Sequence, residues 1–309
     1  MTHGRGDIRE ILVANDLRPR RSLGQNFVAD ANTVRRIVRL SGVAPGDHVI
    51  EVGAGLGSLT LALAETGAEV VAVEVDPAVL PVLREQVEPQ GVRVVEGDAR
   101  TLDWDELLQE ASSWSMVANL PYNVAVPLVV RVLEEAPRIV SLLVMVQREV
   151  GERLAARSGE DAYGAVSVKV AYWATAKVVA RVPPSVFVPR PKVESVVVRL
   201  VRHGAEGGRD GASRSPAGPG NPAYDRLFSV VRAGFAHRRK MLRRSLEGVV
   251  EPAAFTAAGI APTARAEEVS LEGWERLAGW EPGEPGEPGE PWEPGEPGEP
   301  GGPGEPGEA

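Results

Sequence analysis

Short apolar runs alternate with helical patterns along the first half of the chain. Apolar runs of strand length occur at residues 48–52, 69–75, 92–96, 115–118 and 139–146. The segments between them carry apolar residues at helical spacing, at residues 31–41, 59–65, 78–87 and 147–154. Strands that alternate with helices predict an α/β domain with a mainly parallel sheet. The uninterrupted run at 139–146 is typical of a central strand that is buried on both faces.

The pattern changes in the second half. Residues 163–173 (Y-G-A-V-S-V-K-V-A-Y-W) fit neither a helical nor a strand period, whereas residues 178–182 and 193–201 predict two further strands. Gly, Pro and Ser dominate residues 203–222, which is typical of a flexible linker. Residues 224–246 then predict one helix, and residues 253–280 predict further short helices.

These patterns divide the chain into four regions. We expect an α/β domain over residues 1–202, with disorder over residues 1–15, then the linker at 203–222, a small helical domain at 223–280 and a tail at 281–309. The tail repeats Glu-Pro-Gly, which has the spacing of collagen, but the triplets are few and Trp292 occupies a glycine position. The tail is therefore predicted to be disordered.

Composition limits the function classes. The formal net charge of −9 comes from the tail, because the remainder holds 34 acidic residues against 34 Lys+Arg and is neutral. An acidic average therefore does not exclude a nucleic-acid partner. The chain has no cysteine and only 4 histidines, so we expect no disulfide and no metal site. Without an apolar leader or an 18-residue apolar stretch, we expect a cytoplasmic protein with no membrane partner.

The first strand runs directly into a glycine loop, H-V-I-E-V-G-A-G-L-G-S. Glycines at 53, 55 and 57 allow a sharp turn and let a ligand lie against the backbone amides. A dinucleotide site needs its third glycine at the position of Ser58. The spacing G-x-G-x-G after an acidic residue, Glu51, favours S-adenosylmethionine instead. A turn that binds no ligand is the remaining alternative.

Acidic residues follow the next two strands. Glu74 lies 21 residues after Gly53, the distance at which a carboxylate reaches a ribose in nucleotide-binding units. Asp98 follows the third strand and is placed to accept a hydrogen bond from an adenine amine. Either residue alone is equally compatible with an exposed acid in a turn. Together with the glycine loop, they predict a nucleoside-binding edge of the sheet.

The fourth strand ends in N-L-P-Y, residues 119–122. An adenine N6 amine is a poor nucleophile, because its lone pair is delocalised into the ring. The Asn119 side-chain oxygen and the Leu120 carbonyl are two acceptors that can bind both N–H groups and localise that lone pair. Pro121 stiffens the turn, and Tyr122 offers a flat face for an extruded base. The alternative is an ordinary capped turn.

Two later segments add candidate residues. Prolines bracket Phe187 in P-P-S-V-F-V-P-R-P-K, so this ring is either the second stacking partner of a base or the filling of a small apolar gap. The segment 232–244 carries six Lys/Arg and no acid. We predict that its cations contact RNA phosphates, although such a run is often only a solvated face. The five that follow Arg232 form this predicted contact surface: Arg238, Arg239, Lys240, Arg243 and Arg244.

Taken together, these motifs resemble the ribosomal RNA adenine N6,N6-dimethyltransferase family, in particular its bacterial small-subunit branch. The resemblance covers residues 8–280. It lies in S-L-G-Q-N-F (22–27), E-V-G-A-G-L-G-S-L-T (51–60), V-E-V-D (73–76), G-D-A (97–99), N-L-P-Y-N (119–123), M-V-Q-R-E-V (145–150), F-V-P-R-P-K-V-E-S (187–195) and R-R-K-M-L (238–242). Val28 stands where the family usually has Leu, and residues 124–126 lack the Ser/Thr often found there.

The resemblance implies a fold and a set of site residues. The fold is a seven-stranded Rossmann-like methyltransferase sheet whose last strands are antiparallel, with a smaller all-helical C-terminal domain. The residues implied to bind S-adenosyl-L-methionine are Asn26, Val28, Gly53, Gly55, Glu74, Asp98 and Asn119. Those implied to bind or activate the target base are Asn119, Leu120, Pro121, Tyr122 and Phe187, with Tyr122 and Phe187 on either side of it.

The implied activity is N6,N6-dimethylation of two adjacent adenines near the 3′ end of 16S rRNA, during assembly of the small ribosomal subunit. The enzyme is expected to act as a monomer on this rRNA within the subunit or its precursor, without a metal. One rival is a large-subunit rRNA methyltransferase of the antibiotic-resistance type, which usually reads N-I-P-Y. Another is a non-catalytic assembly or nucleic-acid-binding factor on the same fold. A dinucleotide oxidoreductase is disfavoured by Ser58 and has no use for N-L-P-Y.

Overall fold

A computed structural model describes residues 2–205, 216–237 and 240–281 of the 309-residue chain. The strands are β1 (Phe27–Val28), β2 (His48–Val52), β3 (Glu69–Glu74), β4 (Arg93–Glu96), β5 (Trp114–Asn119), β6 (Ile139–Gln147), β7 (Ala174–Val182), β8 (Phe187–Val188) and β9 (Ser195–Arg202). The helices before the linker are α1 (Arg5–Ala14), α2 (Ala31–Ser41), α3 (Ser58–Ala64), α4 (Leu80–Val87), α5 (Trp104–Leu107), α6 (Ala125–Glu135), α7 (Arg148–Ala155) and α8 (Ala165–Trp173). The later helices are α9 (Pro222–Ala236), α10 (Leu242–Ser245), α11 (Pro252–Ala257) and α12 (Leu271–Ala278).

The main sheet has 7 strands in the order β4-β3-β2-β5-β6-β9-β7. Neighbouring strands from β4 to β6 are parallel, and β9 is antiparallel to both β6 and β7. The strand order therefore reverses between β2 and β5, where open α/β sheets bind ligands beyond the carboxyl ends of their strands. The predicted α/β fold is confirmed, with β9 as the strand that runs against the others.

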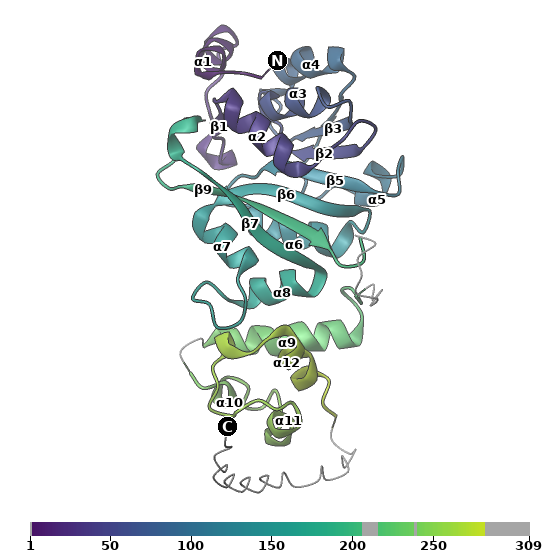
Figure 1. Ribbon diagram of the computed structural model, residues 1–309, viewed down its shortest axis with the longest axis vertical. Helices are drawn as coiled ribbons and strands as arrows, with labels where there is room; N and C mark the ends of the chain where they lie inside the picture. Colours follow the sequence, from purple (N-terminus) through teal and green to yellow (C-terminus); the bar gives the residue numbers. More distant parts are fainter. Residues whose placement is uncertain (1, 206–215, 238–239, 282–309) are drawn as a thin grey trace, which may run out of the picture.

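Helices cover both faces of the sheet because its strands are apolar on both sides (Figure 1). Alternate residues of one strand enter different cores, since successive side chains point to opposite faces. Val49 packs with α2, α3 and α4, whereas Ile50 packs in the core that contains α5 to α8. The second core continues into the C-terminal helices, where Phe228 and Trp274 are buried in it.

The C-terminal helices are held against α8 and α6 by polar contacts as well as by this core. The buried Tyr163 hydroxyl donates to the Val269 carbonyl at 2.9 Å. Glu134 on α6 accepts hydrogen bonds from Lys169 on α8, at 2.6 Å, and from Tyr224 on α9. The helical region is therefore packed firmly against the sheet region, even though the chain between them is rich in Gly, Pro and Ser.

Some local predictions were wrong. Residues 5–14 form helix α1 instead of a disordered end, because Ile8 and Leu12 are buried against Leu56 and the start of α4. The predicted helix over 224–246 ends at Ala236, and Leu242 starts a separate helix while its N–H bonds the Ala264 carbonyl at 2.7 Å. The ambiguous stretch at 163–173 is mostly helix α8.

Two predicted regions fall partly or wholly outside the described residues. Residues 206–215 of the linker and residues 282–309 of the tail are among those that the structure does not describe. Within the ranges that it does describe, no helix is both long and apolar enough to span a bilayer.

Candidate active site

Two adjoining cavities lie beyond the carboxyl ends of β2 to β5. The first is lined by the glycine loop, the N-L-P-Y turn and residues 23–28, and the second is lined by Asp98 and Arg100. Gly53, Val75 and Pro121 line both cavities, so the two adjoin, and we call them the two ends of the pocket.

The glycine loop has the backbone that its sequence predicts. Gly53, Gly55 and Gly57 have φ values of 78°, 56° and 82°, in the left-handed region that side chains with a Cβ rarely adopt. A Cβ on Gly55 would lie 3.0 Å from the Phe27 ring, and one on Gly57 would lie 2.8 Å from Val87. The loop is therefore confined to glycine by its conformation and by its close neighbours, and Gly53 and Gly55 line the first cavity.

Glu74 shapes this loop. Its buried carboxylate accepts from the Gly55 N–H at 2.7 Å and from the Val75 and Asp76 N–H groups, both at 2.9 Å. Burial raises the pKa of Glu74. A carboxylate has about four acceptor positions, so one position on Oε2 is left for a ligand. Glu74 lines the first cavity, where the sequence predicts that it binds a ribose. It also positions the glycine loop, a role that the sequence did not indicate.

Glu51 is a second buried acid in the first cavity. It is only 1 % exposed, and Oε2 accepts a hydrogen bond from the Thr60 hydroxyl at 2.5 Å. Burial raises the pKa of Glu51 to about 8. The side chain is therefore largely uncharged at neutral pH until a positive charge enters the cavity.

Residues 20–28, part of which lines the first cavity, are bound through Arg20 and Gln25 to Asp76, just after the end of β3. The Asp76 carboxylate, which is buried, accepts from the Gln25 side chain at 2.8 Å and pairs with Arg20 at 2.9 Å. Asn26 and Val28, both predicted to bind cofactor, belong to the segment 23–28, which lines the first cavity. Arg20, Gln25 and Asp76 had no predicted role, although Gln25 and Asp76 lie within the motifs S-L-G-Q-N-F and V-E-V-D.

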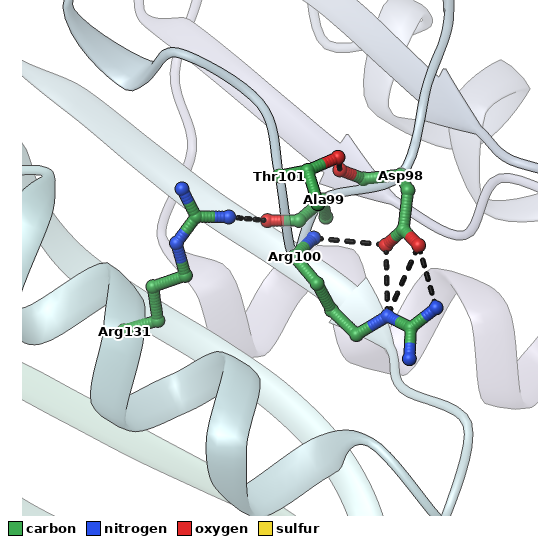
Figure 2. A network of polar contacts seen from close by, with 5 residues as sticks. All are labelled: Asp98, Ala99, Arg100, Thr101 and Arg131. Atoms are coloured by element: carbon green, nitrogen blue, oxygen red, sulfur yellow. Dashed lines mark hydrogen bonds and ion pairs between the residues drawn. The ribbon is translucent and has the colours of Figure 1, made fainter.

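The Asp98 carboxylate at the second cavity is bound by Arg100 (Figure 2). Oδ1 accepts from the Arg100 backbone N–H at 2.9 Å and from Nε at 3.0 Å, and Oδ2 accepts from Nε at 3.0 Å and Nη2 at 2.6 Å. These hydrogen bonds lower the pKa of Asp98. Three N–H groups of Arg100 thus surround this carboxylate, so an adenine amine competes with the guanidinium for it.

Arg131 of α6 is hydrogen-bonded to the loop that carries Asp98. Its guanidinium donates to the carbonyls of Ala99 and Leu102, both at 3.0 Å (Figure 2 shows the first of these contacts). Helix α6 starts a few residues after the N-L-P-Y turn, so this arginine connects the loop that carries Asp98 to the helix that follows that turn.

Asn119 has the orientation that the predicted chemistry requires. Its side-chain Nδ2 donates to the Asn26 carbonyl at 3.0 Å, which leaves Oδ1 as an acceptor at the cavity. The Leu120 N–H bonds the Met145 carbonyl at 3.0 Å, and the Pro121 carbonyl accepts from Val124 at 3.1 Å. The carbonyl of Leu120 accepts no hydrogen bond from any other residue in the described ranges. Both predicted acceptors thus belong to residues that line the first cavity and are fixed by hydrogen bonds to the main chain.

Tyr122 lines the first cavity and is held by Ser195. The two hydroxyls lie 2.8 Å apart, and Ser195 on β9 is fully buried. Burial raises the pKa of Tyr122, so it stays a neutral phenol at physiological pH. Ser195 had no predicted role, although it ends the motif F-V-P-R-P-K-V-E-S.

The predicted position of Phe187 was wrong. The residue is 0 % exposed and lines neither cavity. It pairs with Val28 in the antiparallel β1–β8 ladder, and its ring packs in the core beneath α2. The flanking prolines hold it in an extended strand, as expected, but that strand directs the ring into the core and not over a base.

The predicted RNA-contacting residues are only partly described. Lys240 and Arg243 are exposed, as is their neighbour Arg244. Arg238 and Arg239 lie outside the described residues.

Residues 17–280 match the family described as ribosomal RNA adenine dimethylase. Ribosomal RNA small subunit methyltransferase A of Bifidobacterium longum is 43% identical over 284 residues, covering 89% of this chain and 92% of the relative. The enzyme with that name from Leifsonia xyli subsp. xyli is 44% identical over 286 residues, covering 89% and 97%.

Two solved structures share the fold. The 23S rRNA methyltransferase ErmE has a TM-score of 0.61 at 26% identity, covering 82% of this chain and 98% of its own. A dimethyladenosine transferase from Plasmodium falciparum has a TM-score of 0.62 at 21% identity, covering 80% and 94%.

Proposed function

The chain belongs to the ribosomal RNA adenine dimethylase family, and we propose that its pocket transfers methyl groups from S-adenosylmethionine to N6 of two adjacent adenines near the 3′ end of 16S rRNA. Relatives at 43% and 44% identity over nearly their whole length are named as small-subunit enzymes. The structure of the 23S rRNA enzyme is more distant, at 26% identity. The small-subunit assignment is therefore favoured over the large-subunit one.

The observation that carries the proposal is the arrangement of the N-L-P-Y turn. Asn119 Oδ1 and the Leu120 carbonyl are two acceptors on one rigid turn, beside a tyrosine ring that lines the same cavity. Acceptors that bind both N6–H groups localise the nitrogen lone pair, which then attacks the methyl carbon. Because they are preorganised, they need not reorient when positive charge develops on N6.

The pocket also fits the methyl donor. The left-handed glycines leave room for a ligand against the backbone, and Glu74 keeps one acceptor position toward it. We assign Asn26, Val28, Gly53, Gly55, Glu74, Asp98 and Asn119 to cofactor binding. S-adenosylmethionine, when bound, supplies a methyl group on a positively charged sulfonium.

Proton removal needs no strong base. As N6 bonds to the methyl carbon, the carbon–sulfur bond breaks and its electron pair returns to sulfur. The methylated amine carries a positive charge on an aromatic ring, so it releases its proton to water. The contribution of the protein is thus orientation and hydrogen bonding, with Tyr122 holding the base by stacking.

The test is methyl transfer from labelled S-adenosylmethionine to small ribosomal subunits that lack the modification, with large subunits alongside and the product digested and identified. We expect label in dimethyladenosine from small-subunit RNA. Label in large-subunit RNA would instead indicate a large-subunit rRNA methyltransferase of the antibiotic-resistance type. Binding to subunits without any transfer would leave a non-catalytic assembly factor.

A further inference from the structure

The α2 side of the sheet carries a group of exposed cations that the activity described above does not use. We call it the basic face, and it consists of Arg35, Arg36 and Arg39 on α2, Lys177 on β7 and Arg199 on β9. Two facts place these residues on one side. Arg199 follows Val197 by two positions, so both point to the same face of the sheet, and Val197 packs in the core beneath α2. Arg199 also donates to the Leu40 carbonyl near the end of α2.

The basic face contains no neutralising acid. Lys177 and Arg199 lie directly opposite each other on antiparallel strands, an arrangement in which like charges repel. In the part of the chain that the structure describes, none of the five cations forms an ion pair. Helix α2 itself has no acidic residue between Ala31 and Ser41.

Four arginines elsewhere on the chain are, by contrast, paired with a glutamate. Arg84, Arg93, Arg148 and Arg153 lie 2.7 Å, 3.7 Å, 3.1 Å and 2.8 Å from a glutamate oxygen. An exposed arginine is usually no more than a solvated charge. A facing pair of like charges, next to three arginines without an acid, is instead what a surface for a polyanion requires.

The basic face begins next to the pocket. Val28 lines the first cavity, and α2 starts three residues later at Ala31. A helix of 11 residues is about 16 Å long. It leads away from the pocket toward β9, and no helix lies in front of β7 and β9 in Figure 1. An RNA strand that leaves the pocket could follow this side of the molecule.

We propose that the basic face binds the phosphate backbone of the rRNA whose adenine enters the pocket. This surface is separate from Lys240, Arg243 and Arg244, which lie in and just before α10 of the C-terminal helical region, and the inference rests on the proposed function. Each contact is between a cation and a phosphate, so it contributes to affinity and orientation but not to sequence recognition.

The experiment compares two variants with equal loss of charge. The test variant is Arg35→Gln, Arg36→Gln, Arg39→Gln and Lys177→Gln, which leaves Arg199 to hold Leu40. The control variant is Arg84→Gln, Arg93→Gln, Arg148→Gln and Arg153→Gln. For each we would measure the Kd for unmodified small subunits at several salt concentrations, the Kd for S-adenosylmethionine and the rate of methyl transfer.

We expect the test variant to bind subunits at least about tenfold more weakly, with a log–log salt slope that is smaller by about 3, from roughly 0.7–0.9 per lost phosphate contact. The control variant should keep the native slope, and neither variant should change the Kd for S-adenosylmethionine. Equal behaviour of the two variants would overturn the proposal. Weaker binding with an unchanged slope would overturn it too, and would point to a protein partner.

The proposed function can fail independently. If the native chain methylates small subunits and the test variant binds them as tightly as the control variant does, only the proposed role of the basic face is refuted. A native chain that neither binds nor methylates any subunit refutes the proposed function and this inference together.

Discussion

The two ends of the pocket hold their functional groups in different ways. At the transfer end, Asn119 and Glu74 are hydrogen-bonded to main-chain groups of the loops around them. At the adenine end, Asp98 is bound by the side chain of Arg100, and these side chains are 28% and 60% exposed. Main-chain partners cannot leave without moving the fold, whereas an exposed guanidinium can be exchanged for another donor.

This difference separates chemistry from recognition. Asn119, which we propose acts on the target base, and Glu74, which we propose binds the ribose, are held by main-chain hydrogen bonds before any ligand binds. Stabilisation of a transition state requires such preorganisation. The group expected to recognise adenine would exchange one partner for another, and such an exchange has a small net free energy because exposed ion pairs contribute little to stability. Substitutions at the two ends should therefore differ greatly in the size of their effect.

The largest effect is expected from Asn119→Ala. Loss of one preorganised acceptor should lower kcat by about 10²–10³-fold, as for other groups that stabilise a transition state. The Kd for S-adenosylmethionine should change much less, because the glycine loop and Glu74 remain. Single-turnover rates and calorimetric titration would measure the two quantities. Asn123→Ala, an exposed change in the same turn, is the control and should retain most of the rate.

Glu74→Gln should have the next largest effect. The glutamine can accept with only one of its two polar atoms, so one of the N–H groups of Gly55, Val75 and Asp76 loses its partner. A buried unpaired N–H costs about 1–3 kcal/mol, which corresponds to a roughly 5- to 150-fold weaker Kd if it falls on the ligand-bound loop.

Glu96→Gln is the matched control for Glu74→Gln. Glu96 lies opposite Glu74 in the β3–β4 register but is exposed. It should leave both the Kd and the melting temperature near the native values. Equal losses in the two variants would mean that the position in the sheet matters and not the loop contacts.

Glu51 should make cofactor binding depend on pH. Its pKa is raised from 4.5 to about 8, so in the ligand-free chain it releases its proton only as the pH approaches 8. A positive sulfonium in the same cavity favours the carboxylate, so binding of S-adenosylmethionine should release protons near pH 7. Affinity should then rise with pH, by at most about tenfold per unit, and level off above pH 8.

Calorimetry in buffers with different ionisation enthalpies would count these protons. S-adenosylhomocysteine, which lacks the sulfonium charge, should release fewer, and Glu51→Gln should abolish the difference. The contribution of Glu51 to folding stability changes with pH in the opposite direction to the affinity for S-adenosylmethionine. Because the folded-state pKa is raised, Glu51 contributes stability below pH 4.5 that is lost as the pH rises toward 8. Equal proton release for both ligands would contradict this role.

The smallest effect is expected from Arg100→Ala. The variant frees the Asp98 carboxylate, so the Kd for S-adenosylmethionine should tighten, by no more than about fivefold. In the native chain, added salt should strengthen binding slightly by weakening the ion pair, and the variant should lack this dependence. Titration at several salt concentrations would show it. A variant that binds more weakly would mean that Arg100 orients Asp98 and does not compete with the ligand.

The parts of the site that the sequence predicted correctly are those that depend on local pattern. The glycine positions follow from backbone conformation, and the order of Glu74, Asp98 and Asn119 follows from the alternation of strands and helices. Residues at the carboxyl ends of parallel strands meet at one edge of a sheet, so their convergence needs no knowledge of tertiary contacts.

The parts that were missed depend on partners distant in sequence. The Tyr122 hydroxyl is hydrogen-bonded to Ser195, and the pairing of Phe187 with Val28 directs the Phe187 ring into the core. Neither contact produces a periodic pattern in the sequence. Helix α1 was taken for a disordered end because its exposed face is polar, and its two buried residues have partners in α4 and the glycine loop. The pairing of Arg100 with Asp98 is local, but it depends on the side-chain conformation in a turn.

The most direct test is a crystal structure of the chain with S-adenosylhomocysteine. The account predicts one ligand along the whole pocket, with its amino-acid end against Gly53 and Gly55, its ribose at Glu74 and its adenine amine on Asp98. The contact between Arg100 and Asp98 should be broken, while the Asn119–Asn26 hydrogen bond stays intact. A ligand bound with the Arg100–Asp98 contact unchanged, or with Asn119 turned away from Asn26, would contradict it.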